Sequence, residues 1–235
     1  MFTTSATCIS KEYSQSGDVV IIRFRVEQYF DFQAGQFVLG TFQIQNKVIK
    51  RSYSIYSTMV EMKSDSLLAL LVKKTSDPYV SQYLTDDIQI WHHVQFTWPL
   101  GHLTLQISQP KLLLLSIGSG VTPIASLMQD RLASGDYKQI VNLYGERYRN
   151  HIARHTRNLF QTSLPGVNSR IYLSQELAWD GYQVWHIQQW LSDTLPIINQ
   201  DWTVVICGKP NFVDEMIQIL MTHGIQKWQI KSEKY

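Results

Sequence analysis

Three short segments of this 235-residue chain carry side chains suited to binding phosphate groups and flat rings. In the first, Arg51-Ser52-Tyr53-Ser54, the arginine offers a planar guanidinium fork that matches phosphate oxygens. The tyrosine offers a face for a flat ring, and Ser54 offers a hydroxyl that can hydrogen-bond and relay a proton. Strand alternation predicts that Arg51 and Tyr53 share one face and that Ser54 lies on the other. Without a ligand, the same tetrapeptide would form an ordinary strand.

The second segment is the glycine-rich SIGSGVTP at 116–123, and the third is VVICGKP at 204–210. Glycines let a backbone approach a ligand closely, and a helix N-terminus attracts phosphate. Pro123 suits the first position of such a helix. The segment is not the GxGxxG dinucleotide fingerprint, and a glycine-rich turn can also bind nothing. Cys207, taken alone, predicts a buried core cysteine beside a turn.

These segments need elements that position them, and residues 1–105 predict short strands separated by turns. The segment PYVSQYLT at 78–85 predicts a single short helix that begins at Pro78, with Asp77 as its N-cap. Many strands and one short helix indicate an antiparallel barrel. The patterns expected to form strands lie at 19–26, 35–44, 51–57 and 67–74, with a further candidate at 89–98.

From Lys111 onward, strand patterns alternate with helix patterns, which predicts a doubly wound parallel sheet. Pro110 interrupts the chain just before the first buried strand, so we expect one domain at 1–107 and a second at 111–235. The expected strands are 112–117, 139–145, 168–174, 202–208 and 228–235, and the expected helices are 124–135, 150–163, 182–193 and 210–224.

The composition excludes several classes of protein. A hydrophobic content of 44% supports a folded core, and a net charge of +2 gives no indication of nucleic-acid binding. No apolar run approaches the roughly 20 residues that span a bilayer, and no signal peptide is recognisable, so we expect no membrane insertion and a cytoplasmic location. The two cysteines, Cys8 and Cys207, are too few for a four-cysteine iron–sulfur site, and reduced thiols are expected. No metal site is predicted.

In their order and spacing, the three segments resemble the ferredoxin–NADP reductase superfamily over nearly the whole chain. The resemblance implies an N-terminal antiparallel Greek-key flavin-binding barrel followed by a doubly wound nucleotide-binding domain. It also implies that Arg51 binds the flavin diphosphate. By the same resemblance, Tyr53 packs against the isoalloxazine and the Ser54 hydroxyl lies near flavin N5.

The family's second phosphate-binding turn resembles PYVSQYL, in which Val80 and Ser81 would supply the matching donors. Pro78 stands where the family usually has glycine, and proline lacks an N–H group. We therefore expect FAD as the cofactor, with FMN as the less favoured alternative.

The resemblance also assigns a nicotinamide-nucleotide site. Cys207 would line the nicotinamide pocket without acting as a covalent nucleophile. Arg147 would help hold the 2′-phosphate of NADPH, but Gln175 stands where NADPH-using relatives usually have a second arginine. Either NADPH or NADH therefore remains possible. The residues assigned to this site are Gly118, Gly120, Thr122, Pro123, Arg147, Ser174, Cys207, Gly208 and Pro210.

The sequence ends at an aromatic residue, Tyr235, as in plant-type ferredoxin reductases and oxygenase reductases. In those proteins the terminal ring covers the flavin face that nicotinamide must reach. Glu233 would join Ser54 and Cys207 in a hydrogen-bonding group. These three residues and Tyr235 are the predicted catalytic set.

The resemblance implies a flavin oxidoreductase that passes hydride between NAD(P)H and bound flavin. A separate ferredoxin or flavodoxin is the first expected partner and an oxygenase component the second, with the direction of electron flow open. The basic stretch 147–157, with four arginines and two histidines, is either a solvated helix face or a docking site for such a partner. A reductase that uses flavin as a diffusible substrate, and a non-catalytic electron-transfer or regulatory subunit, are the alternatives. We expect a monomer.

Overall fold

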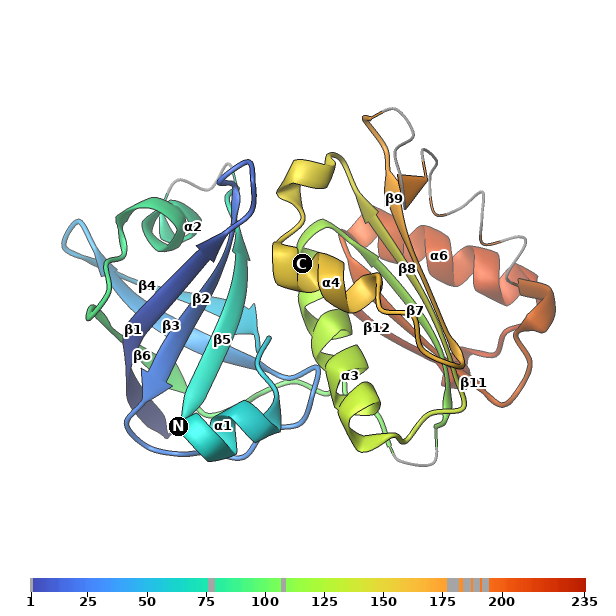
Figure 1. The fold of residues 1–235 in the computed structure, drawn as a ribbon, viewed down its shortest axis with the longest axis horizontal. Helices are drawn as coiled ribbons and strands as arrows, with labels where there is room; N and C mark the ends of the chain where they lie inside the picture. Colours follow the sequence, from blue (N-terminus) through green and yellow to red (C-terminus); the bar gives the residue numbers. More distant parts are fainter. Residues whose placement is uncertain are drawn as a thin grey trace.

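The computed structural model describes residues 2–75, 79–106, 109–176 and 195–235, together with residues 182, 183, 187 and 191. It contains two six-stranded sheets that lie side by side (Figure 1). The first sheet is antiparallel and the second is parallel, so the predicted fold class is confirmed. None of the helices in the described part of the chain is long and apolar enough to cross a bilayer.

The N-terminal sheet is a partly closed barrel with the strand order β4-β3-β6-β1-β2-β5. Aromatic rings fill its interior, where Phe24 and Phe42 both contact Phe96 edge to face. Only an isolated bridge between Ile55 and Leu70 connects the two ends of the sheet in the described residues. The strands are β1 (Thr3–Tyr13), β2 (Val19–Val26), β3 (Phe37–Ile44), β4 (Lys47–Ser54), β5 (Leu67–Lys73) and β6 (His93–Thr97).

Two helical segments flank this barrel. Helix α1 (Met59–Asp65) begins at a capping box in which Thr58 and Glu61 satisfy each other's backbone N–H groups. The short helix α2 (Val80–Gln82) continues into a π-helical turn, η1 (Tyr83–Asp87). The helix predicted from Pro78 therefore begins at Val80, while Asp77 and Pro78 lie outside the described residues.

The C-terminal sheet has the strand order β10-β9-β8-β7-β11-β12, and the order reverses between β7 and β11. In doubly wound sheets, ligands bind at the carboxyl ends of the strands at this reversal. The four leucines of 112–115 in β7 are fully buried because helices cover both faces of the sheet. The strands are β7 (Lys111–Ile117), β8 (Gln139–Glu146), β9 (Val167–Leu173), β10 (Tyr182–Gln183), β11 (Trp202–Gly208) and β12 (Ile230–Lys234).

Helices α3 (Val121–Ser134) and α4 (Arg154–Phe160) cover one face of this sheet, and α6 (Pro210–Thr222) covers the other. The 3-10 turns are η2 (Gly118–Gly120), η3 (Arg149–His151), η4 (Leu195–Ile197) and η5 (Lys227–Gln229). Helix α3 ends where Gly135 adopts a positive φ of 74°.

Three predicted boundaries were wrong. The helix expected over 150–163 is divided into η3 and the shorter α4, and the strand expected over 89–98 extends only over His93–Thr97. The helix expected over 182–193 is incorrect at its start, where Tyr182 and Gln183 pair with β9. Most of its remaining residues lie outside the described part of the chain.

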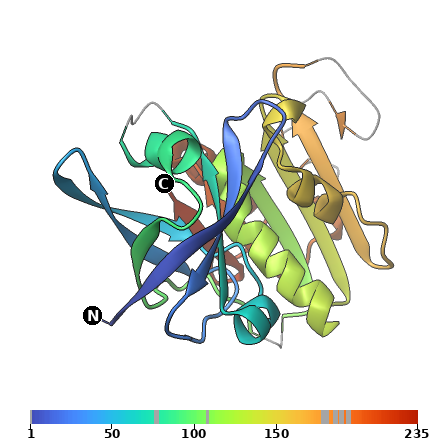
Figure 2. The same cartoon turned by 60° about the vertical axis from the view of Figure 1, so that its left-hand side comes forward.

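Helix α3 joins the two domains. One apolar cluster includes Val19, Ile21 and Leu71 from the barrel together with Ile124 and Met128 from α3. Figure 1 and Figure 2 both show α3 on the side of the parallel sheet that faces the barrel. The barrel therefore packs against helix α3 of the parallel-sheet domain.

Candidate active site

A cleft of about 770 Å³ runs along the boundary between the two domains. This volume lies within the range of cofactor pockets, which span roughly 300–1,000 Å³. The barrel supplies its walls from β4, β5, α2 and the segment after β6, and the nucleotide domain supplies them from η2, α3 and β12. The residues on which the following paragraphs depend are Arg51, Tyr53, Ser54, Lys73, Thr75, Val80, Ser81, His102, Ser119, Thr122, Glu233 and Tyr235.

Arg51, Tyr53 and Ser54 lie near the end of β4 and all contribute to the cleft wall. Backbone pairing with β3 fixes their order, since Arg51 lies opposite Gly40 and Ser54 opposite Phe37. The Tyr53 ring is held edge to face by Phe42, with ring centroids 6.1 Å apart. Strand alternation predicted that Ser54 lies on the opposite face from Arg51 and Tyr53. All three residues nevertheless line the cleft, because the cleft extends around the end of the strand.

Val80 and Ser81 of α2 line the same cleft as the residues of β4. The Ser81 hydroxyl is 3.0 Å from the Thr75 hydroxyl and accepts a hydrogen bond from the Thr75 backbone N–H at 3.2 Å. These contacts hold the start of α2 beside the end of β5. A guanidinium and a helix start facing one cleft form a donor set that fits a diphosphate.

The glycine turn after β7 is tightly packed against β11. A Cβ atom on Gly120 would lie 2.2 Å from the Cys207 carbonyl oxygen and 2.9 Å from the Tyr235 hydroxyl. Only glycine fits at this position without displacing the backbone of β11. Helix α3 begins at Val121, so Pro123 is its third residue, and the prediction that Pro123 opens the helix was wrong. Thr122 donates a hydrogen bond to the Ser119 carbonyl at 3.0 Å and lines the cleft.

Cys207, Glu233 and Tyr235 come together because β11 and β12 are neighbours in register, with Cys207 opposite Glu233. The Tyr235 hydroxyl is hydrogen-bonded to Cys207 and Ser119. The side chain is 46% exposed as a whole, but its hydroxyl end is enclosed, and burial raises the pKa of Tyr235 well above its usual value. The Tyr235 hydroxyl therefore lies beside both the Gly120 turn and Cys207, and Tyr235 lines the cleft.

Burial determines the protonation of this group. Burial and the nearby Glu233 charge raise the pKa of the Cys207 thiol to about 12, which makes it a neutral thiol at pH 7. A neutral thiol is a poor nucleophile, in agreement with the predicted orienting role. Burial also raises the pKa of Glu233.

Other predicted residues lie outside the cleft wall. Arg147 and Ser174 follow β8 and β9, where the Ser174 N–H donates to the Glu146 carbonyl at 2.9 Å. Gly208 ends β11, and Pro210 is the first residue of α6. These residues share the carboxyl edge of the sheet with the glycine turn, so they border one continuous surface.

Sequence reasoning missed Lys73, Thr75 and His102, which also line the cleft. The sequence does show that the charged pair Lys73-Lys74 follows the last buried position of an apolar strand, and this pattern could have indicated a functional lysine at the strand end. Nothing in the local sequence distinguished the lysine that faces the cleft from its neighbour.

Residues 6–105 match the oxidoreductase FAD-binding domain family, and residues 114–218 match the oxidoreductase NAD-binding domain family. A ferredoxin–NADP reductase from Azotobacter vinelandii is 26% identical over 216 residues, which cover 83% of this chain and 80% of that protein. The chain therefore consists of an oxidoreductase FAD-binding domain followed by an oxidoreductase NAD-binding domain, and its homologues include a ferredoxin–NADP reductase. The predicted FAD and NAD(P) cofactors are confirmed, and the chain carries the two domains of an NAD(P)H-dependent flavoprotein reductase.

Two further comparisons extend the similarity to other known proteins. The ferredoxin reductase component of 3-ketosteroid-9-alpha-monooxygenase from Mycobacterium tuberculosis is 35% identical over 99 residues, which cover 42% of this chain. The chain spans only 26% of the length of that protein. The crystal structure of a cytochrome P450 reductase from Amycolatopsis has a TM-score of 0.85 at 20% identity and covers 99% of this chain and 69% of its own.

Proposed function

We propose that this reductase transfers hydride from NAD(P)H to bound FAD and then delivers single electrons to a separate protein. The carrying observation is the contact of Tyr235 with Cys207 and Ser119 in a cleft whose other wall holds Ser54. Bound FAD supplies hydride acceptance and one-electron release, chemistry that no side chain provides. The protein's part is to bind, orient and exclude water.

The barrel residues hold the cofactor in this proposal. Arg51 and the backbone N–H groups near Val80 and Ser81 bind the diphosphate. Tyr53, whose ring contacts Phe42 edge to face, would pack against the flavin ring. Ser54 would offer its hydroxyl as a hydrogen-bonding partner for the flavin nitrogen at which hydride would arrive. Each role uses a residue that lines the cleft.

Tyr235 acts as a displaceable cover in this proposal. Its hydroxyl lies against the Gly120 turn and Cys207, where a nicotinamide ring would need to enter. Nucleotide binding therefore requires the ring to leave. Cys207 then contacts the nicotinamide as a neutral thiol, and Glu233 supplies a carboxyl group beside it on the paired strand.

The dinucleotide phosphates bind at the carboxyl edge of the sheet. Gly118 and Gly120 admit the diphosphate to the start of α3, and Arg147 and Ser174 contact the adenosine end. Gly208 and Pro210 shape the opposite side of the same edge. Thr122 and Pro123 hold the turn in its helical start.

Two comparisons support a separate electron acceptor. The Azotobacter relative is a ferredoxin–NADP reductase, and the mycobacterial relative is the reductase component of a monooxygenase. A ferredoxin, a flavodoxin or an oxygenase component is therefore the proposed acceptor. The exposed basic residues in 147–157 are a candidate surface for an acidic partner.

The visible spectrum of the freshly purified protein tests this function. We expect a yellow protein with bands near ~375 and ~450 nm that bleaches on anaerobic addition of NADPH or NADH. A colourless protein that oxidises NAD(P)H only when free flavin is added would instead identify a reductase of diffusible flavin. A yellow protein that neither nucleotide reduces would identify a non-catalytic relative.

A further inference from the structure

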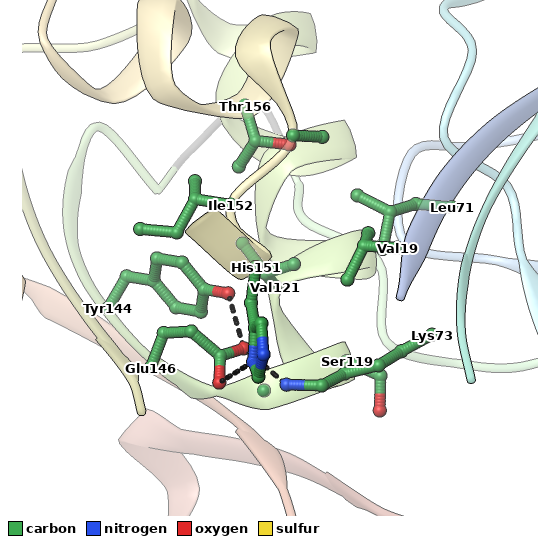
Figure 3. A pocket seen from close by; sticks show the side chains of 12 residues that line it. Val19, Leu71, Lys73, Ser119, Val121, Tyr144, Glu146, His151, Ile152 and Thr156 are labelled. Carbon is green, nitrogen blue, oxygen red and sulfur yellow. Dashed lines mark hydrogen bonds and ion pairs between the residues drawn. The ribbon is translucent and has the colours of Figure 1, made fainter. Parts of the chain in front are cut away.

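A group of titratable side chains from both domains meets beside the cleft (Figure 3). Lys73, the last residue of β5, reaches across the domain boundary, where its Nζ lies 2.6 Å from Oε2 of Glu146 at the end of β8. Close by, Nε2 of His151 lies 3.5 Å from Oδ2 of Asp18 in the barrel. The proposed hydride transfer assigns no role to these four residues.

Glu146 is held as a buried carboxylate. Its side chain is only 2% exposed, and Tyr144 donates a hydrogen bond to it at 3.2 Å. Burial alone would raise the pKa of Glu146, but the charge and hydrogen bond of Lys73, the Arg147 backbone N–H and the charge of His151 lower it below its usual value. The largest contribution that favours the carboxylate comes from Lys73, which belongs to the other domain.

The ion pair connects the two halves of the proposed site. Lys73 lines both the large cleft, beside Ser119 and Tyr235, and the small cavity of Figure 3. At its other end, Glu146 accepts the backbone N–H of Arg147 at 2.7 Å. A shift in the Lys73–Glu146 separation would therefore move the flavin-facing end of β5 relative to the nucleotide-binding edge.

Apolar packing alone cannot fix this separation. The contacts in the cluster that joins α3 to the barrel have no preferred direction. The short charge-assisted hydrogen bond between the partly exposed Lys73 and the buried Glu146 has a defined length and direction. Hydride transfer is sensitive to such geometry, because a misplacement of about 1 Å can lower a rate about 100-fold.

We propose that Lys73 and Glu146 are positioning residues that hold the nucleotide domain at the distance from the flavin barrel that hydride transfer requires. This inference rests on the proposed function. It assigns the pair no contact with the reacting atoms. It predicts that breaking the pair slows flavin reduction while nucleotide affinity and FAD binding change little.

The test compares two neighbouring lysines in the FAD-loaded protein. Lys73→Met removes the cross-domain ion pair, and Lys74→Met removes the exposed pair of Lys74 with Asp86, which lies within the barrel at 2.5 Å. Anaerobic stopped-flow reduction by saturating NAD(P)H should slow about 10- to 100-fold in Lys73→Met and stay unchanged in Lys74→Met. Lys73→Arg, which keeps a cation, should restore most of the rate. The Kd for NADP⁺ or NAD⁺ should change less than about threefold.

Glu146→Met gives the second side of a double-mutant cycle. If the two residues act as one pair, the double variant should be no slower than the slower single variant. The variant K73M/E146M leaves no unpaired buried charge, so it keeps the test possible if a single variant does not fold. Flavin reduction by NAD(P)H in this double variant should be slow even at a temperature well below the melting temperature of the variant.

Three results would overturn the inference. The first is a wild-type reduction rate in Lys73→Met. The second is a multiplicative effect in the double variant. The third is a shift of the flavin midpoint potential in Lys73→Met that accounts for the whole rate change, which would assign Lys73 to electrostatic tuning. A wild-type protein that NAD(P)H does not reduce would instead refute the proposed function.

Discussion

Replacing Tyr235 with serine should tighten the binding of NADP⁺ or NAD⁺. In this structure the Tyr235 hydroxyl is hydrogen-bonded to Cys207 and Ser119, and Tyr235 lines the cleft. If nicotinamide uses the same space, the ring must be displaced first. The free energy of its contacts then weakens the observed affinity, as for any ligand that binds a minor state.

The exposure of the side chain gives the size of the effect. Tyr235 is 46% exposed, so it buries about half of the roughly 200 Å² that an aromatic side chain can bury. At about 25 cal/mol per Å², this burial contributes ~2.5 kcal/mol. Two weak hydrogen bonds add about 1 kcal/mol together, and ordering the side chain subtracts a similar amount. A net ~2.5 kcal/mol corresponds to about 70-fold in Kd.

The assay is a difference-absorption titration of the oxidised, FAD-loaded protein with each nucleotide. Tyr235→Phe keeps the ring and removes only the hydrogen bonds, so its Kd should fall about fivefold, between wild type and Tyr235→Ser. A Kd for Tyr235→Ser within twofold of wild type would show that the ring does not compete with nicotinamide, and the covering role would be wrong.

Three further perturbations test other parts of the site. Arg51→Ala removes the charged donors proposed for the diphosphate, so FAD should bind about 10- to 100-fold more weakly, as measured by FAD content after gel filtration; full retention would exclude Arg51 from this role. Gly120→Ala places a methyl group 2.2 Å from the Cys207 carbonyl oxygen, so it should lower the free energy of unfolding, measured in urea, by about 2 kcal/mol or more. In the control variant Gly118→Ala the added Cβ meets nothing within 4 Å, and only the positive φ of 54° opposes it. Equal losses of stability in the two variants would argue against the steric account. The pKa of Glu146 is lowered on folding, so its carboxylate stabilises the protein above its unfolded pKa of about 4.5, and this contribution is lost as the pH falls through the folded value. Wild type should therefore lose more unfolding free energy than Glu146→Gln between about pH 5 and pH 3, and parallel losses would contradict the linkage.

The sequence predicted the elements whose patterns are local. The leucine run of β7 has no polar position, and it forms a strand buried on both faces. The glycine turn and the Cys207 segment follow two such strands, so parallel packing brings them to one edge. The family resemblance, and not a local pattern, implied the grouping of Glu233 with Cys207, and the parallel pairing of β12 with β11 brings these two residues opposite each other.

The sequence failed where contacts between elements decide the outcome. Tyr182 and Gln183 form strand pairs because the free edge of β9 accepts them, although their own pattern indicated a helix. The role of Lys73 depends on how the barrel sits against β8, and no local pattern encodes that arrangement. Helix α3 begins at Val121, directly after the 3-10 turn at 118–120. This start lies two residues before Pro123, the residue predicted to occupy the first position of the helix.

The apolar cluster shared by the barrel and α3 has a consequence for synthesis of the chain. The last barrel strand ends at Thr97, and α3 is complete only at Ser134. At about 5–20 residues per second, the ribosome adds this stretch in about 2–7 s. During that interval the barrel can fold while Val19, Ile21 and Leu71 have no helix to cover them. A nascent chain stalled between these two points should therefore be the form of this protein most prone to aggregate and most readily bound by a chaperone.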